Sequence, residues 1–291
     1  MTGGRLGIAG VGLIGGSIAL RARAAIPGVR IAGFDTDAGT VARALERGIL
    51  DAPAASLAAL AAQSETLVIA LPVDATDAAL DALAGTPGAA LVIDVASVKG
   101  LFSRHAERVA NYVGTHPMAG RERGGIDAAD ADLFLGASWA HTPHADPALV
   151  ERVRAFIRAM GARALEVDAA AHDEIVALTS HLPQALSVVL GAELAAARDP
   201  LVFDLCGPGI RSMLRLARSP AALWSPIIGA NAGPLSRRLR SIAAALQRAA
   251  IALEAGDSEP LMSYFKAARD ATAALEQQTP PTPRSSSYRC P

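Results

Sequence analysis

Cysteine is scarce in this chain, since Cys206 and Cys290 are the only two among 291 residues. They lie far apart and belong to no cluster with metal-ligand spacing, so the sequence predicts neither a disulfide framework nor a zinc site. We therefore expect no bound metal. A chain without a disulfide framework is typical of a reducing compartment, which predicts a cytoplasmic protein.

An excess of charge of either sign is also missing. Lys and Arg number 27 against 28 Asp and Glu, which gives a formal net charge of -1. Nucleic-acid binders normally carry a basic face or stripe, so this balance argues against a nucleic-acid partner. Hydrophobic residues make up 51% of the chain and charged residues 19%. A chain of this length and hydrophobicity can bury a large core, which excludes general disorder.

Signals for secretion or membrane insertion are weak. Residues Leu6–Leu20 form an unbroken run of Gly, Ser and apolar residues behind Arg5. The run is rich in glycine, however, and Arg21 and Arg23 follow where a signal peptide would need a small-residue cleavage site. No later segment is expected to reach the roughly 18 uncharged apolar residues of a membrane span. We expect neither secretion nor a membrane partner.

The first part of the chain alternates strand-like runs with helical stretches. The expected strands are Leu6–Ala9, Arg30–Phe34, Thr66–Leu71, Ala90–Val95, Tyr112–Gly114, Ala137–Thr142 and Arg163–Val167. The expected helices between them are Leu13–Ala25, Asp37–Arg47, Asp74–Leu83 and Pro147–Met160. This alternation predicts an α/β fold: a doubly wound, Rossmann-type domain over residues 1–168, with a parallel sheet covered by helices on both faces.

The second part is different, because its Ala/Leu-rich segments have helical spacing and no convincing strand interrupts them. The expected helices are Ala169–Ala197, Arg211–Arg218, Leu235–Ala255 and Glu259–Gln277. We therefore expect an all-helical domain over residues 169–278. The tail at residues 279–291 holds four prolines and three consecutive serines, which is typical of a disordered segment.

A glycine-rich loop follows the first expected strand and opens the first helix. In its G-x-G-x-x-G pattern, Gly10 permits the tight turn, Gly12 lets the backbone approach a pyrophosphate, and Gly15 lets the helix pack on the strand. The helix N-terminus offers free N–H groups to the phosphates. The expected cofactor-binding residues of this loop are Gly10, Gly12, Leu13, Ile14 and Gly15.

A carboxylate at the end of the second strand completes the dinucleotide pattern. Asp35 lies 20 residues after Gly15, where it would accept a hydrogen bond from a ribose 2′-hydroxyl. It favours NAD over NADP, because a carboxylate repels a 2′-phosphate. The alternative is that Asp35 only caps the next helix.

Three further segments place polar residues in loops: D-V-A-S-V-K from Asp94, T-H-P-M-A-G-R-E from Thr115, and S-H-L-P-Q from Ser180, with R-L-A-R-S following from Arg215. Together with the glycine loop, these motifs resemble the prephenate and arogenate dehydrogenases of tyrosine biosynthesis, in order from about residue 5 to 275. The resemblance implies NAD-dependent oxidative decarboxylation of prephenate to 4-hydroxyphenylpyruvate, or of arogenate to tyrosine. It also implies a homodimer formed through the helical domain.

The resemblance implies that His116 is the catalytic histidine and that Ser97 orients the reacting hydroxyl, the histidine or both. A neutral histidine has the right basicity to accept the proton of the C4 hydroxyl near pH 7. His116 could instead be an ordinary histidine at a strand end, and Ser97 could cap a helix that begins at Val98.

The remaining residues of the pattern are expected to bind substrate. Arg215 matches an arginine that binds a substrate carboxylate, with Arg211 and Arg218 as nearby alternatives. His181 could position substrate or stabilise the domain interface, and Glu122 could contact the site or lie in solvent. Gln184 replaces a histidine of some relatives, and Arg121 replaces a smaller residue. Both lie where the substrate side chain would be recognised, so they bear on the choice between prephenate and arogenate.

The other histidines fit no motif, whereas Trp224 ends the motif that begins at Arg215. We expect the histidines to lie at the surface and both tryptophans in the core: His105, His141, His144 and His172, and Trp139 and Trp224. The rival functions are another NAD(P)-dependent hydroxyacid or imine oxidoreductase of the same architecture, and a non-catalytic NAD-sensing protein. The joint presence of Ser97, His116 and Arg215 argues against the second rival.

Overall fold

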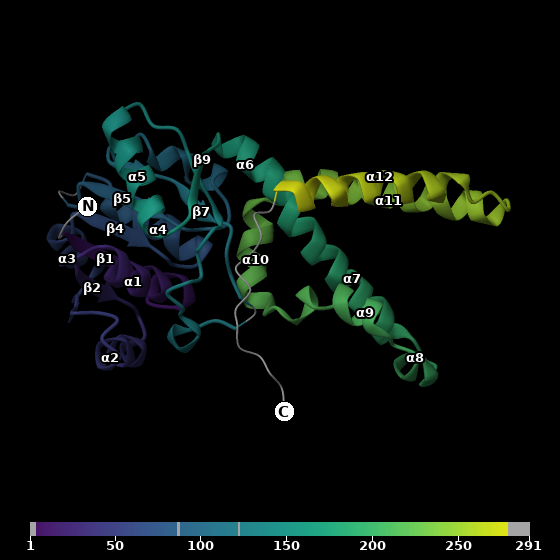
Figure 1. The fold of residues 1–291 in the computed structure, drawn as a ribbon, viewed down its shortest axis with the longest axis horizontal. Coiled ribbons are helices and arrows are strands. Elements are labelled where there is room, and N and C mark those ends of the chain that lie inside the picture. Colours follow the sequence, from purple (N-terminus) through teal and green to yellow (C-terminus); the bar gives the residue numbers. More distant parts are fainter. Residues whose placement is uncertain (1–3, 86–87, 122, 279–291) are drawn as a thin grey trace. The chain divides into compact units, whose positions relative to one another are not determined.

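The computed structural model describes residues 4–85, 88–121 and 123–278 (Figure 1). The chain forms two compact units, Met1–Leu235 and Ser236–Pro291. All the elements that build the candidate site belong to the first unit. The tail predicted to be disordered, residues 279–291, lies outside the described residues.

A six-stranded parallel sheet forms the centre of the first unit. Its strands are β1 (Arg5–Ala9), β2 (Arg30–Phe34), β3 (Ala52–Pro53), β4 (Thr66–Ile69), β5 (Leu91–Asp94) and β6 (Tyr112–Val113). Their order is β3-β2-β1-β4-β5-β6, and every neighbouring pair is parallel. The order reverses between β1 and β4, the point at which such sheets bind dinucleotides. The predicted fold class is confirmed, and the short strand β3 is an addition to it.

Helices cover both faces of this sheet, as the sequence predicts. They are α1 (Leu13–Ala25), α2 (Ala38–Glu46), α3 (Leu57–Gln63), α4 (Val73–Leu83) and α5 (Pro147–Ala159), with 3-10 turns η1 (Gly100–His105) and η2 (Ile126–Ala128). Successive side chains of a strand point to opposite faces, so Val68 packs in the core with α1 and α5, whereas Leu67 and Ile69 pack with α3 and α4. Helix α3, absent from the sequence prediction, begins where Ser56 accepts a hydrogen bond from the N–H of Ala59.

A second, three-stranded sheet carries the predicted catalytic histidine. It consists of β7 (Thr115–Pro117), β8 (Ser138–His141) and β9 (Arg163–Glu166); β7 is antiparallel to β8, and β8 is parallel to β9. Trp139 of β8 is fully buried against Phe134 and Phe156, as predicted. Its indole N–H donates to the hydroxyl of Thr115 at 2.9 Å, which fixes strand β7 beside the core.

From residue 169 onward the described chain contains helices and turns but no strand, which confirms the helical second part. The elements are α6 (Ala169–Val176), the π-helical turn η3 (Ala177–His181), α7 (Leu182–Ala196), α8 (Leu201–Asp204), α9 (Pro208–Met213), the 3-10 turn η4 (Leu216–Arg218), α10 (Ala221–Ala230), α11 (Ala232–Glu254) and α12 (Glu259–Gln278). The single helix predicted over Ala169–Ala197 is therefore interrupted by a π-helical turn.

The helical run Ala169–Ala196 is long and apolar enough, by length and composition, to cross a membrane, contrary to the sequence expectation. It also carries His172, His181 and Gln184, three polar side chains that are almost completely buried within the protein. Polar side chains are costly in lipid, and these three have hydrogen-bond partners in the first unit. A third of this window is buried in the structure, and apolar side chains such as Val188 and Val189 are exposed.

Candidate active site

The glycine loop between β1 and α1 has the geometry that a dinucleotide requires. Gly10 has a φ of +88°, and a Cβ there would lie 2.3 Å from the carbonyl oxygen of Ala70. A Cβ on Gly15 would lie 2.0 Å from the carbonyl oxygen of Gly10, so only glycine permits this approach of helix to loop. At Gly12, the N-cap of α1, a Cβ would meet nothing within 4 Å, and the loop surface there is open. Leu13 and Ile14 form the first turn of the helix, whose N–H groups are available to phosphate.

Asp35 lies directly beside this loop, at the end of β2. Its carboxylate accepts hydrogen bonds from the N–H of Val11 at 2.8 Å and of Asp37 at 3.0 Å. The capping role considered for Asp35 belongs to Asp37, whose side chain accepts from the N–H of Gly39 at the start of α2. The structure thus places the Asp35 carboxylate at the glycine loop, where a ribose would lie. These residues fit a bound NAD.

The D-V-A-S-V-K motif is organised around a fully buried carboxylate. Asp94, at the end of β5, pairs with the ammonium of Lys99, and both side chains are at most 2% exposed. The carboxylate also accepts from the hydroxyl of Tyr112 at 2.8 Å and from the N–H of Thr115 at 3.1 Å. Asp94 therefore joins the end of β5 to β7, the strand that carries His116.

Ser97 lies half-buried in the loop between the paired residues Asp94 and Lys99. The next helical turn, η1, begins only at Gly100, and its N-cap residue Lys99 makes no side-chain capping bond. The predicted alternative role of Ser97 as a helix cap is therefore wrong. The buried ion pair closes the loop and fixes the backbone on both sides of Ser97.

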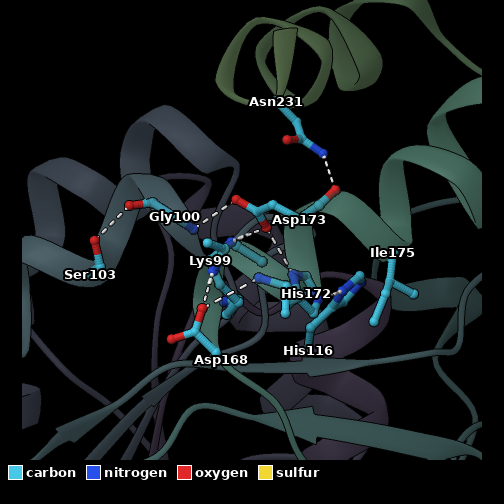
Figure 2. A network of polar contacts seen from close by, with 12 residues as sticks. Lys99, Gly100, Ser103, His116, Asp168, His172, Asp173, Ile175 and Asn231 are labelled. Carbon is cyan, nitrogen blue, oxygen red and sulfur yellow. Dashed lines mark hydrogen bonds and ion pairs between the residues drawn. The ribbon is translucent and has the colours of Figure 1, made fainter. Parts of the chain in front are cut away.

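His116 belongs to a chain of hydrogen bonds that runs from β7 into helix α6 (Figure 2). Its Nδ1 lies 3.0 Å from Nε2 of His172, and Nδ1 of His172 lies 2.8 Å from a carboxylate oxygen of Asp173. The Asp173 carboxylate also accepts from the N–H groups of Lys99 at 2.8 Å and Gly100 at 2.7 Å. Asp168 begins α6 by accepting from the N–H groups of its first turn. This chain of bonds thus connects strand β7 with helix α6.

Burial determines the protonation of this chain. It lowers the pKa of His116 well below its usual range, and the neighbouring His172 and Lys99 act in the same direction. Burial raises the pKa of Asp173, but the hydrogen bonds from His172, Lys99 and Gly100 outweigh it and lower the pKa overall. His116 is therefore neutral and Asp173 ionised at neutral pH.

His181 ends the π-helical turn and lies in a buried polar contact with Asn231. The amide nitrogen of Asn231 lies 3.1 Å from Nδ1 of His181 and donates to the carbonyl oxygen of Asp173 at 2.8 Å. Trp224 packs edge-on against the His181 ring with centroids 6.0 Å apart, and is only partly buried, so its expected place in the core is partly correct. Nε2 of His181 is buried without a hydrogen-bond partner among the described residues.

Arginines line a cavity of about 920 Å³ in the first unit. Arg121, Arg123, Arg215 and Arg218 face it, with Asp127 the acidic residue in its lining. Arg121 pairs with the carboxylate of Asp130. Such a lining favours an anionic ligand, and Arg215, the residue predicted to bind a carboxylate, is among its members. Glu122, the predicted neighbour of this site, lies outside the described residues.

Gln184 of α7 is buried and connects to the segment that carries Arg215. Its amide nitrogen donates to the carbonyl oxygen of Leu216 at 2.9 Å, and its Oε1 is buried without a partner among the described residues. Ser187, one turn later, accepts from the N–H of Ala217 at 3.0 Å. Helix α7 thus fixes the backbone immediately after Arg215.

Three of the histidines expected at the surface are buried, which corrects the sequence prediction. His105 contacts Asp77 at 2.8 Å, His141 contacts the carbonyl oxygen of Thr142 at 3.1 Å, and His172 joins the chain described above. His144 is partly exposed. His172 lies beside Asp173 and Glu174 in an Ala-rich helix, and this spacing does not indicate which of the polar residues is buried.

Comparison with known proteins assigns the family. The family described as "Prephenate dehydrogenase, nucleotide-binding domain" matches residues 18–166, and "Prephenate dehydrogenase, dimerization domain" matches residues 168–267. The prephenate dehydrogenase of Bacillus subtilis is 32% identical over 90% of this chain and 74% of its own length.

Solved structures agree in fold. An arogenate dehydrogenase from Synechocystis superposes with a TM-score of 0.77 at 27% identity, over 92% of this chain and 99% of that one. The prephenate dehydrogenase from Aquifex aeolicus, in complex with hydroxyphenyl propionate and NAD+, gives a TM-score of 0.86 at 24% identity, over 94% and 98%.

The nucleotide-binding fold and the dimerization domain, with their matches to prephenate dehydrogenases, define a decarboxylating dehydrogenase. The chain belongs to the prephenate dehydrogenase family. The enzyme class predicted from the sequence, a prephenate/arogenate dehydrogenase of tyrosine biosynthesis, is confirmed at the level of this family.

Proposed function

We propose that this enzyme converts both prephenate and arogenate, with NAD as hydride acceptor. The observation that carries the proposal is the neutral His116, held in β7 by His172 in the unit that also contains the glycine loop and the arginine-lined cavity. The side chain of prephenate carries a keto group, whereas that of arogenate carries an ammonium at the same carbon. Gln184 can donate to the first or accept from the second, so it need not exclude either substrate.

The residues of the glycine loop and Asp35 would hold the cofactor. The positive φ of Gly10 and the open surface at Gly12 leave room for a pyrophosphate, and the N–H groups of α1 would bind it. Asp35 would accept from the ribose 2′-hydroxyl. When bound, NAD supplies the acceptor for the hydride that leaves C4 of the substrate.

His116 would accept the proton of the C4 hydroxyl and later return it. Its Nε2 accepts this proton as the hydride leaves, and Ser97 orients the hydroxyl. The bond to the ring carboxylate then breaks, CO2 departs, and its electron pair completes the aromatic ring. His116 returns the proton to the phenolate oxygen, so no net proton is released.

Arg215 would bind the side-chain carboxylate of the substrate. Its planar guanidinium suits a bidentate contact. Binding the ring carboxylate instead would stabilise the group that must be expelled, so the physics favours the side-chain carboxylate. His181 and Arg121 would complete the binding site, with Glu122 as a further candidate.

The direct test is NADH formation with each substrate and each cofactor. Purified enzyme is mixed with prephenate or arogenate, and with NAD or NADP, and absorbance at the NADH band is followed. The proposal expects turnover of both substrates with NAD. If kcat/KM for the two substrates differed by more than about a thousandfold, roughly 4 kcal/mol, the site would be built to reject one side chain.

Substitution of Arg215→Gln is expected to raise the substrate KM by about ten- to a hundredfold. One neutral hydrogen bond would replace a charge-assisted pair, a difference of about 1.5–3 kcal/mol. Steady-state kinetics on prephenate would measure the effect, with NAD affinity as the readout for an intact fold. Arg211→Gln is the matched control on the preceding helix α9. If KM rises in the control and not in Arg215→Gln, the role belongs to Arg211.

Substitution of Asp35→Ala is expected to narrow a preference for NAD over NADP. The change removes the carboxylate that repels a 2′-phosphate, although it also removes the acceptor for the N–H of Val11. The measured quantity is the ratio of kcat/KM for the two cofactors. Asp37→Ala removes a nearby exposed carboxylate and should change this ratio less. A wild-type enzyme that used NADP better would contradict the role given to Asp35.

We also propose a cytoplasmic homodimer, with a nucleotide-binding domain over residues 1–168 and a substrate-binding and dimerisation domain over residues 169–278. The family is one of soluble biosynthetic enzymes, and its dimerization domain matches residues 168–267. Large apolar side chains are exposed in the helices of both compact units, which supports their burial against a second copy of the chain. They are Val189, Leu201, Phe203 and Leu205 in the first unit, and Leu246, Ile251 and Phe265 in the second.

A further inference from the structure

We propose that His172 and Asp173 are positioning residues that set the tautomer of His116 and thereby leave its Nε2 free to accept the substrate proton. The contacts that carry this proposal are the 3.0 Å separation of His116 Nδ1 and His172 Nε2, and the 2.8 Å separation of His172 Nδ1 and Asp173 (Figure 2). The proposal rests on the proposed function of His116.

The assignment of protons starts from the carboxylate, because an ionised carboxylate can only accept. His172 must therefore carry its proton on Nδ1, the nitrogen that faces Asp173. In the proposed arrangement Nε2 of His172 carries a lone pair, and His116 donates to it through Nδ1–H. The second nitrogen of His116, Nε2, is left with the lone pair that a general base requires.

The opposite tautomers of the two histidines would prevent His116 from acting as a base. If His172 carried a proton on Nε2, it would donate to Nδ1 of His116, and the proton of neutral His116 would lie on Nε2. That nitrogen could no longer accept from the C4 hydroxyl. Two features hold the productive arrangement. Asp173 accepts hydrogen bonds from the backbone N–H groups of Lys99 and Gly100, and the His172 side chain is buried, at 3% exposed.

The same contacts support His116 after it accepts the substrate proton. The imidazolium then keeps Nδ1–H directed at a neutral acceptor, and the ionised Asp173 lies one residue further along the chain of bonds. Within the part of the chain that the structure describes, the other charged or titratable groups around His116 are Lys99, whose charge is matched by Asp94, and His181. Asp173 is therefore the negative charge connected to His116 through hydrogen bonds.

Two amide substitutions at His172 separate the proposed role from simple packing. In His172→Asn the amide can still reach Asp173 but cannot reach His116, so the tautomer of His116 is no longer fixed. In His172→Gln the longer amide can place its oxygen near the former Nε2 and accept from Nδ1–H of His116. We expect kcat to fall about 10- to 100-fold in His172→Asn with KM within about threefold, and to recover at least tenfold in His172→Gln.

A second readout is independent of turnover. Nitrogen-15 NMR of the histidine rings in the full-length protein reports which ring nitrogen of His116 carries the proton. The wild type and His172→Gln should show the proton on Nδ1, whereas His172→Asn should show a mixture or the Nε2 tautomer. Wild-type His116 protonated on Nε2 at neutral pH would overturn the proposal.

His105 offers a matched control, because it is equally buried and also contacts a carboxylate, Asp77. His105→Asn and His105→Gln should give the same kcat, whatever they do to stability. Equal kcat values for the two His172 variants would mean that the residue only packs. If His116→Asn itself kept full activity, the proposed function of His116 would fail instead, so the two failures are distinguishable.

Discussion

Replacing His116 with asparagine is expected to lower kcat by about a hundred- to ten-thousandfold while NAD binding survives. A general base typically contributes this much, and an amide cannot take up the hydroxyl proton. Asparagine can keep a polar contact near Nδ1, so the bond to His172 need not be lost and the fold should persist. Steady-state turnover and NAD titration, followed by tryptophan fluorescence, measure the two quantities.

The pH profile gives an independent check on the same residue. His116 acts as a base, so activity is present above its pKa and falls as pH drops through it. Because burial lowers this pKa well below the usual histidine range, the acidic limb of kcat/KM should lie at lower pH than for an ordinary histidine. Activity within threefold of wild type in His116→Asn would remove His116 from the mechanism.

Substitution of Lys99→Met is expected to destabilise the protein by about 3–5 kcal/mol. The change leaves the carboxylate of Asp94, which is fully buried, without its positive partner. Chemical denaturation followed by circular dichroism would show loss of structure in the first unit at a lower denaturant concentration. The double variant Asp94→Asn with Lys99→Met removes both charges and should recover part of the loss.

An exposed ion pair provides the matched control. Arg5 and Glu65 lie 3.2 Å apart with side chains 62% and 49% exposed, and Arg5→Met should change stability little. If Lys99→Met destabilised the protein as little as Arg5→Met, the buried charge of the Asp94 carboxylate would be compensated by groups other than Lys99. The joining role assigned to Asp94 would then need revision.

The sequence predicted those features that depend on short-range pattern. Alternating strand and helix signals identified the parallel sheet, and the spacing from Gly15 to Asp35 identified the dinucleotide loop, because both are read within one βαβ unit. His116 is the predicted base because its motif matches that of the family and directly follows a strand. Each of these signals is local in the chain.

The partners of His116 were missed because they depend on contacts between distant segments. His172 lies 56 residues away in the sequence, and an Ala-rich helix has no spacing signal that reveals which of its polar residues is buried. The ion pair of Asp94 and Lys99 was within a quoted motif, but its burial depends on β7 packing over it. Tertiary contacts of this kind cannot be derived from periodicity alone.

The π-helical turn at Ala177–His181 has a consequence for the phase of the long helical run. In an uninterrupted α-helix, at about 100° per residue, His172 and His181 would project about half a turn apart. A π turn accommodates one additional residue and rotates everything beyond it by about 100°. The chain length between these histidines, as much as their identity, therefore decides whether His181 meets Asn231 and Gln184 meets Leu216. A deletion of one residue before His181 in this turn would keep His172, His181 and Gln184 in the chain but would change the directions in which they project relative to one another.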